Sequence, residues 1–227
     1  MNTSSILKLG TNTYIKEIPK IIKSTLYLVI KRLFDLFAST IGIIILLPVF
    51  IIIIFLIKKE DKGSAFFTQE RIGKNGKLFR LYKFRSMVHN ADDILYEMLK
   101  DPEISREYKK NMKLPNDPRI TKIGKFIRKT SLDELPQLIN VFLGHMSLIG
   151  NRPYLPREKD DMGIFYEDII KTKPGITGYW QVNGRSNLSF EQRCELESFY
   201  SNNMNFLLDI IIFFLTIYVV LTKKGAE

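Results

Sequence analysis

Residues 36–57, LFASTIGIIILLPVFIIIIFLI, decide the fold, because they carry no charged side chain in a chain with a net charge of +10. As one straight helix this run would reach about 33 Å, enough for a hydrocarbon core of about 30 Å. Pro48 divides it into pieces of about 18 and 14 Å, and neither piece spans a bilayer alone. Proline removes a backbone donor and clashes with the preceding turn, so the sequence predicts a kink or break there.

Positive residues flank both ends of the run. Lys31 and Arg32 precede it, and Lys58, Lys59 and Lys62 follow it. Positive flanks favour the cytoplasmic side, and neither end is the obvious one to export. A helix-break-helix that enters one leaflet and returns satisfies both flanks, while a single kinked span is the simpler alternative. The run is too long, and begins too late, for a secretory signal peptide.

The remaining composition limits the class of protein. The single cysteine, Cys194, excludes an internal disulfide and fits a reducing compartment. Outside the membrane segment, the chain has room for one modest domain of roughly 150 residues. Its positive charge fits an anionic partner: lipid headgroups, a phosphorylated substrate or nucleic acid. Nucleic acid is the weakest of these, because the sequence contains no recognisable nucleic-acid motif.

The middle of the chain predicts a helix-rich α+β fold. Residues 65–68 and 78–84 resemble strands and enclose the turn signal of residues 73–76, which predicts a β-hairpin. Residues 91–112 alternate acidic and basic side chains around an apolar stripe and predict a solvated helix with its loop. Residues 116–150 predict helix, turn and helix, with Gly144 as the final stop.

Both ends of the chain predict surface helices. Within residues 14–30, apolar side chains recur at helical spacing between lysines, which predicts an amphipathic helix on the membrane. Residues 206–221 are strongly apolar, but at about 24 Å they are short for a span. They predict a helix half sunk in the interface or packed on the first membrane segment. Residues 173–185 predict a loop or short strand.

A pair of adjacent acids, Asp133 and Glu134, lies in the sequence KTSLDELP at residues 129–136. Ser131 and Glu134 also fit a capping box, although Pro136 would then be the fifth helical residue and would cost a hydrogen bond. In the functional alternative the two side chains diverge by about 100° along a helix. One carboxylate could attack a phosphorus while the other holds a divalent cation.

Several cations could bind phosphates. Arginine suits this role because its planar fork binds phosphate through two hydrogen bonds, and Pro153 would stiffen the loop beside Arg152. For a chain this basic, the alternative for each is an ordinary surface charge. His89 and His145 lack metal-ligand spacing, and no Walker loop occurs. The candidates are Lys83, Arg85, Arg128, Arg152 and Arg185.

Seven motifs follow one another from residue 31 to residue 185, and the match that they define runs to about residue 225. They are KRLFD (31–35), the run broken by Pro48, FFTQERIG (66–73), KFRSM (83–87), SLDELPQ (131–137), MSLIGNRP (146–153) and KPGITGYWQVNGR (173–185). This ordered series closely resembles the bacterial monotopic phosphoglycosyl transferases, also called polyprenyl-phosphate sugar-1-phosphate transferases. The chain resembles the small, single-domain form of that family.

The resemblance implies an activity. Such enzymes transfer a sugar-1-phosphate from a UDP-sugar to undecaprenyl phosphate, release UMP and require Mg²⁺, in the first membrane step of surface glycan assembly. By motif position, Asp133 is the nucleophile that forms a covalent phospho-sugar ester, and Glu134 helps to bind Mg²⁺. Arg128 and Lys83 assist the chemistry.

The resemblance also assigns a donor-binding loop, Asn151-Arg152-Pro153, and places Arg85, Gln181 and Arg185 among the substrate-binding residues. It favours the re-entrant membrane helix. Two departures stand out: Leu47 precedes Pro48 where many members have serine, and Asn151 replaces the first proline of the loop, which is expected to loosen it.

The resemblance divides the chain into four parts at the cytoplasmic face of the bacterial inner membrane. They are an amphipathic extension (1–30), a re-entrant helix (31–59), a cytoplasmic catalytic domain (60–205) and an interfacial helix with its tail (206–227). The expected partners are a UDP-sugar, undecaprenyl phosphate and membrane lipids, without nucleic acid, and a homodimer is left open. The alternatives are a non-catalytic basic assembly protein of the membrane surface and a metal-dependent phosphatase.

Overall fold

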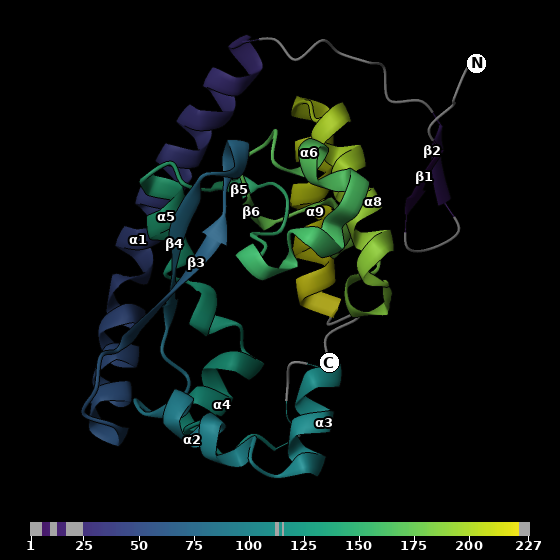
Figure 1. The fold of residues 1–227 in the computed structure, drawn as a ribbon. Helices are drawn as coiled ribbons and strands as arrows, with labels where there is room; N and C mark the ends of the chain where they lie inside the picture. The colour runs from purple at the N-terminus through teal and green to yellow at the C-terminus, as the bar shows by residue number, and fades with distance from the viewer. Residues whose placement is uncertain (1–5, 10–12, 17–24, 112–113, 115, 223–227) are drawn as a thin grey trace. The chain divides into compact units, whose positions relative to one another are not determined.

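The computed structural model describes residues 6–9, 13–16, 25–111, 114 and 116–222 (Figure 1). Helices dominate, and the described strands form three two-stranded sheets, which confirms the helix-rich α+β class. The α-helices are α1 (Thr25–Glu60), α2 (Ala91–Met98), α3 (Pro102–Asn111), α4 (Lys122–Lys129), α5 (Gln137–Phe142), α6 (Tyr166–Ile169), α7 (Tyr179–Val182), α8 (Phe190–Asn203) and α9 (Phe206–Thr222). The strands are β1 (Ile6–Leu9), β2 (Thr13–Lys16), β3 (Phe66–Ile72), β4 (Leu78–Phe84), β5 (Ser147–Ile149) and β6 (Gly175–Thr177).

Helix α1 contains the apolar run and is 36 residues long, about 54 Å. The helix continues through Pro48, so the chain is not broken there. A proline removes one hydrogen bond but leaves the rest of the helical series in place. By length and composition α1 could cross a membrane, and most of its apolar side chains are exposed, among them Ile44, Ile45, Ile51 and Phe55.

The amphipathic helix predicted over residues 14–30 does not begin where expected. Residues 14–16 belong to β2, which pairs antiparallel with β1, and residues 25–30 already belong to α1. Residues 17–24 lie outside the described part of the chain.

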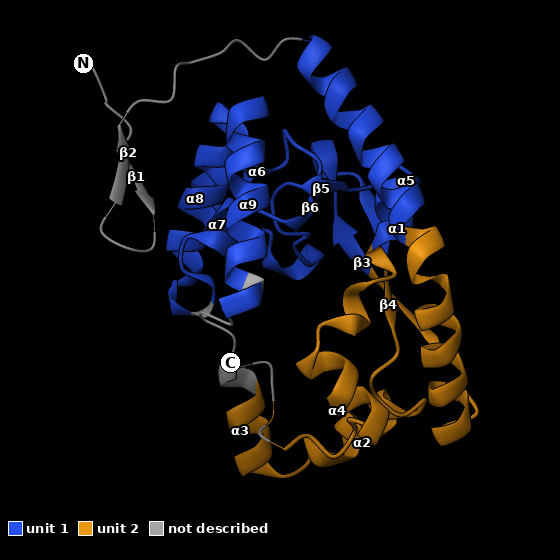
Figure 2. Ribbon diagram, turned by 180° about the vertical axis from the view of Figure 1, so that it is seen from behind, with its two compact units in different colours: residues 1–42, 70–81, 138–227 blue, residues 43–69, 82–137 orange. Residues whose placement is uncertain are grey.

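The described chain divides into two compact units, coloured in Figure 2. Unit 1 comprises residues 1–42, 70–81 and 138–227, and unit 2 comprises residues 43–69 and 82–137. The predicted hairpin is confirmed: β3 pairs with β4 around the short 3-10 turn η1 (Lys74–Gly76). Asn75 and Gly76 have positive φ angles of 57° and 74°, which such a tight turn needs and which asparagine and glycine tolerate.

Unit 2 is built on the second half of α1. Its core joins Phe50, Ile53 and Ile57 of α1 to Phe84 at the end of β4 and Ile127 of α4. The last residue of α1 also binds α4 directly. The Glu60 carboxylate accepts the N–H groups of Lys122 and Ile123 at 2.7 and 2.9 Å. Because the first N–H groups of a helix lack partners within it, Glu60 stabilises the start of α4.

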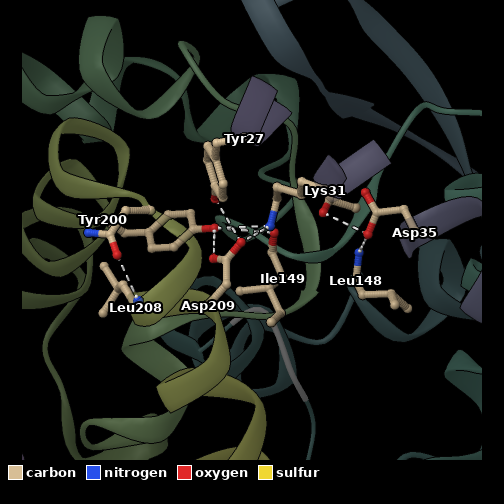
Figure 3. A network of polar contacts seen from close by, with 10 residues as sticks. Tyr27, Lys31, Asp35, Leu148, Ile149, Tyr200, Leu208 and Asp209 are labelled. Carbon is tan, nitrogen blue, oxygen red and sulfur yellow. Dashed lines mark hydrogen bonds and ion pairs between the residues drawn. The ribbon is translucent and has the colours of Figure 1, made fainter. Parts of the chain in front are cut away.

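Unit 1 ties the first half of α1 to α8 and α9 through a carboxylate (Figure 3). Asp209 of α9 accepts hydrogen bonds from Tyr27 and Lys31 of α1 at 2.7 and 2.6 Å. It also accepts the hydroxyl of Tyr200, from α8, at 2.7 Å. Four residues after Lys31, Asp35 accepts the N–H of Leu148 at 2.9 Å. The only acid in the apolar C-terminal helix is therefore the point at which that helix is fastened to α1.

The predicted C-terminal helix is confirmed as α9, which has one buried and one exposed apolar face. Leu208 and Ile212 lie in the core with Tyr200. The opposite side leaves large apolar side chains exposed, including Phe206, Phe214 and Leu221. The expected loop or short strand at residues 173–185 contains β6, parallel to β5, but also the short helix α7.

Candidate active site

The acid pair lies in a strained turn between α4 and α5. Helix α4 ends at Lys129, and Asp133 and Glu134 occupy a 3-10 turn, η2 (Leu132–Glu134). Ser131 has a φ of 56° and makes no capping hydrogen bond with its side chain. The capping-box interpretation is therefore wrong, because the backbone of Ser131 adopts the left-handed conformation and no α-helix starts there. A non-glycine residue in this region stores strain, and such strain gathers at functional sites.

Lys83, from the end of β4, lies against this turn. Its ammonium group donates to Glu134 Oε1 at 2.6 Å, and the side chains of Lys83 and Glu134 are 25% and 43% exposed. The ion pair is reachable from solvent, unlike a pair buried in the core. It fixes one acid of the pair and places a positive charge beside the other.

Arg128, in the last turn of α4, completes the cluster. Its Nε donates to the hydroxyl of Ser86 at 2.8 Å. Helix α4 approaches this strand end so closely that a Cβ on Gly124 would lie 1.9 Å from the Ser86 carbonyl oxygen. Glycine at position 124 therefore allows α4 to hold Arg128 beside the segment that carries Lys83.

Burial and the neighbouring charges act in opposite directions on Asp133. Burial raises the pKa of the Asp133 carboxyl, while the positive charges of Lys83 and Arg128 lower it and the negative charge of Glu134 raises it further. Burial likewise lowers the pKa of Arg128. Overall the pKa of Asp133 is raised, because burial outweighs the two cations, so its carboxylate is poorly solvated and therefore more reactive, as an activated nucleophile requires.

The side-chain oxygen atoms of this cluster suit a hard divalent ion that takes few of its ligands from the protein. Glu134 is an exposed carboxylate, and among the residues that the structure describes no group of three or more His, Cys, Asp or Glu could hold a metal. Mg²⁺ is commonly bound by one or two carboxylates together with water and substrate phosphates. Glu134 fits that use, with one of its oxygens shared with Lys83.

Unit 1 holds the second group of predicted residues, in the loop after β5. The Asn151 amide nitrogen donates to Ile169 O at 3.0 Å, Thr172 Oγ1 at 3.2 Å and Ser201 Oγ at 2.6 Å. The carbonyl of Pro153 accepts a hydrogen bond from Arg71. The loosening expected from Asn151 is not seen, because its side chain is anchored where a proline ring would make no hydrogen bonds.

Arg152 lies among aromatic rings. Its guanidinium carbon is 5.9 Å from the centre of the Tyr154 ring and 6.0 Å from that of Trp180. Arg193, from α8, lies 4.6 Å from the same Trp180 ring. Three buried N–H groups here lack a hydrogen-bond acceptor: Arg152 Nε, Arg193 Nε and Trp180 Nε1. Three donors without acceptors are suited to an anion.

Sequence reasoning did not identify Trp180, Arg193 or Glu197 as site residues. The Glu197 carboxylate is fully buried and accepts the Arg152 N–H at 2.6 Å. A spacing signal was present: Cys194, Glu197 and Ser201 recur on one face of α8, and all three are buried.

The other predicted residues are placed differently. Arg85 is buried against Asp61, with an ion pair of 3.2 Å, so its guanidinium serves unit 2 itself. Gln181 donates to the Ile176 carbonyl at 3.2 Å within unit 1. Arg185 has a φ of 49°, directly after Gly184. The structure thus gathers Lys83, Arg128, Asp133 and Glu134 in unit 2 and does not bring Arg85 into that cluster.

Comparison with known proteins identifies the family to which the chain is similar. The "Bacterial sugar transferase" family matches residues 26–223. The chain is 46% identical over 198 residues to the UDP-galactose-lipid carrier transferase of Erwinia amylovora, and 45% identical over 201 residues to the undecaprenyl-phosphate galactose phosphotransferase of Salmonella typhimurium. Each match covers 87% of this chain but only 41% of the relative.

A shorter relative matches over most of its own length. The exopolysaccharide production protein ExoY of Rhizobium meliloti is 38% identical over 200 residues, which cover 86% of this chain and 87% of ExoY. The resemblance drawn from the seven motifs is confirmed: the chain belongs to the bacterial sugar transferase family.

Proposed function

We propose that this protein transfers a sugar-1-phosphate from a UDP-sugar to undecaprenyl phosphate and releases UMP. The names of its relatives support this, since they include a UDP-galactose-lipid carrier transferase and an undecaprenyl-phosphate galactose phosphotransferase. The observation that carries the proposal is the cluster in unit 2. Asp133 lies in a strained turn beside the Lys83–Glu134 ion pair, with Arg128 at the end of the preceding helix.

The reaction is proposed to proceed in two displacements. An oxygen of the Asp133 carboxylate attacks the phosphorus that bears the sugar, forming a new P–O bond as the bond to the bridging oxygen breaks. UMP leaves with that oxygen and its negative charge. An oxygen of undecaprenyl phosphate then attacks the same phosphorus, the bond to Asp133 breaks, and the carboxylate is restored. Covalent catalysis of this kind lets the soluble nucleotide leave before the lipid binds.

The basic residues serve this chemistry electrostatically. Both substrates are anions and would be repelled by a carboxylate nucleophile, so the positive charges of Lys83 and Arg128 stabilise their approach. Glu134 is proposed to hold Mg²⁺, which supplies further positive charge to the phosphate oxygens when it is bound. Arg152 and the unpaired N–H groups around Trp180 are proposed to bind the donor diphosphate.

The charges that flank the apolar run support a re-entrant anchor. Lys31 and Arg32 precede the run and Lys58, Lys59 and Lys62 follow it, and positive flanks favour the cytoplasmic side. The two ends of α1 are bound within units 1 and 2 by Lys31 and Glu60. We therefore propose that α1 enters and leaves on the cytoplasmic face, bending at Pro48, with the exposed face of α9 in the interface.

Cysteine labelling tests this topology. With Cys194→Ser as background, cysteines at Thr13 and Ser64 should label alike with a membrane-impermeant thiol reagent in intact cells. Opposite labelling of the two positions would establish a span and exclude the re-entrant anchor.

The activity is tested by UMP release from a panel of UDP-sugars with undecaprenyl phosphate and Mg²⁺. The proposal expects multiple turnovers only when lipid phosphate and Mg²⁺ are both present. Lack of UMP release with every donor would favour the non-catalytic assembly protein. Release of inorganic phosphate from the lipid alone would favour the phosphatase.

A further inference from the structure

A buried acid lies beneath the loop that carries Arg152. Glu197 of α8 has no exposed surface, and its Oε1 accepts the backbone N–H of Arg152 at 2.6 Å. Burying a carboxyl group is costly unless its interactions offset the lost hydration. No ion pair among the described residues includes Glu197, and its second oxygen, Oε2, has no hydrogen-bond partner. The other groups that act on the Glu197 carboxyl are the Tyr154 hydroxyl and the charges of Arg152 and Arg193, all of which lie around the loop that carries Arg152.

Three residues on the same face of α8 contact the loop that carries Arg152. Ser201 receives the Asn151 amide at 2.6 Å, Glu197 receives the Arg152 N–H, and Cys194 lies 3.7 Å from the Tyr154 hydroxyl. The Ser201 contact involves the side chain of Asn151, and the Glu197 contact involves the backbone of Arg152. Neither contact uses the Arg152 guanidinium. Among the three, only the Glu197 bond acts on the backbone of the residue that is proposed to bind the donor.

We infer that Glu197 is a positioning residue for donor binding, holding the Arg152 backbone so that its guanidinium stays beside Tyr154 and Trp180. The inference rests on the proposed function, because it takes Arg152 as a ligand of the donor diphosphate. Binding sites need their contact residues fixed closely by a supporting shell. A main-chain N–H that loses a buried acceptor would shift to find another, and the guanidinium would move with it.

The acceptor oxygen, and not the negative charge, is what this role requires. Burial raises the pKa of Glu197 to about 8, so the neutral acid predominates at pH 7. Glutamine keeps the acceptor oxygen and the shape of the neutral acid. Methionine has a similar length but no strong acceptor. The two variants separate the hydrogen bond from simple filling of the space.

The test measures binding of UDP with Mg²⁺ to the full-length protein, together with hydrogen exchange of the Arg152 amide. Glu197→Met should weaken UDP binding about tenfold and remove the protection of this amide. Glu197→Gln should stay within about twofold of wild type. The matched control is Ser198→Ala, which removes a 2.7 Å bond from the adjacent residue to Asp168 and should leave UDP binding unchanged.

A double-mutant cycle places the effect on Arg152. Arg152→Lys should itself weaken UDP binding, because lysine cannot form two parallel bonds to phosphate, and Glu197→Met should add little in that background. Unchanged binding and protection in Glu197→Met, or a Gln variant as weak as the Met variant, would overturn the inference. If the Met variant does not fold, rapid exchange of the wild-type Arg152 amide or weak binding by the Gln variant still overturns it.

The proposed function can fail separately. A wild-type protein that does not bind UDP overturns the donor site, and with it the donor role of Glu197. UDP binding that depends on Arg152 but not on Glu197 overturns only the present inference.

Discussion

Replacing Glu197 by glutamine should change how stability depends on pH. The buried acid has a pKa of about 8 in the folded protein, against 4.5 as its ordinary value. Between these values the folded protein keeps a proton that the unfolded chain releases, so raising the pH favours unfolding. The stability associated with this group is fully present below about pH 4.5 and is lost as the pH rises to about 8. The loss is about 1.4 kcal/mol per pH unit, or as much as about 5 kcal/mol in total.

Glutamine has no proton to release in this range, so the variant should gain stability relative to wild type as the pH rises. Unfolding by denaturant in one detergent, at pH 5, 6.5 and 8, measures this difference directly. Glu195→Gln, at an exposed position of the same helix, controls for the loss of one negative charge. A constant difference in unfolding free energy between wild type and Glu197→Gln, within about 0.5 kcal/mol from pH 5 to 8, would refute burial of a neutral acid at this site.

Three further substitutions test the two groups of site residues. Asn151→Ala removes the three buried hydrogen bonds of its amide and should cost about 1–3 kcal/mol in thermal unfolding; an unchanged melting temperature would contradict the anchored loop. Gly124→Ala brings a Cβ to 1.9 Å from Ser86 O, so it should lower UMP release by moving α4 and Arg128, and full activity would contradict that placement. Glu134→Gln should slow UMP release steeply but recover partly at higher Mg²⁺, since an amide is a weaker ligand; a defect independent of Mg²⁺ would remove Glu134 as the metal ligand.

Local patterns in the sequence identified the elements with strong periodicity. The turn signal at residues 73–76 predicted the β3–β4 hairpin, and the apolar faces of residues 116–150 predicted α4, α5 and the stop at Gly144. Helix α9 was likewise predicted from its apolar run. These features depend on neighbours close in sequence, which is why they can be read from it.

Features set by distant contacts could not be predicted. Ser131 adopts its left-handed conformation in a turn whose flanking Leu132 and Leu135 pack on the core of unit 2. Arg85 and Arg128 both lie near acids, and only the structure shows that Arg85 is buried against Asp61. Asn151 was expected to loosen its loop because its partners, 18 to 50 residues away, are invisible to a local pattern.

The identity of the nucleophile is the central claim, and mass spectrometry tests it most directly. Wild-type protein incubated with UDP-sugar and Mg²⁺, without lipid acceptor, should release at most one equivalent of UMP. The peptide containing Asp133 should gain the mass of one sugar phosphate, and adding undecaprenyl phosphate should remove it. Asp133→Asn keeps the shape but lacks the attacking anion, so it should show neither UMP release nor adduct. Full turnover by a folded Asp133→Asn protein, or an adduct on another residue, would contradict the account.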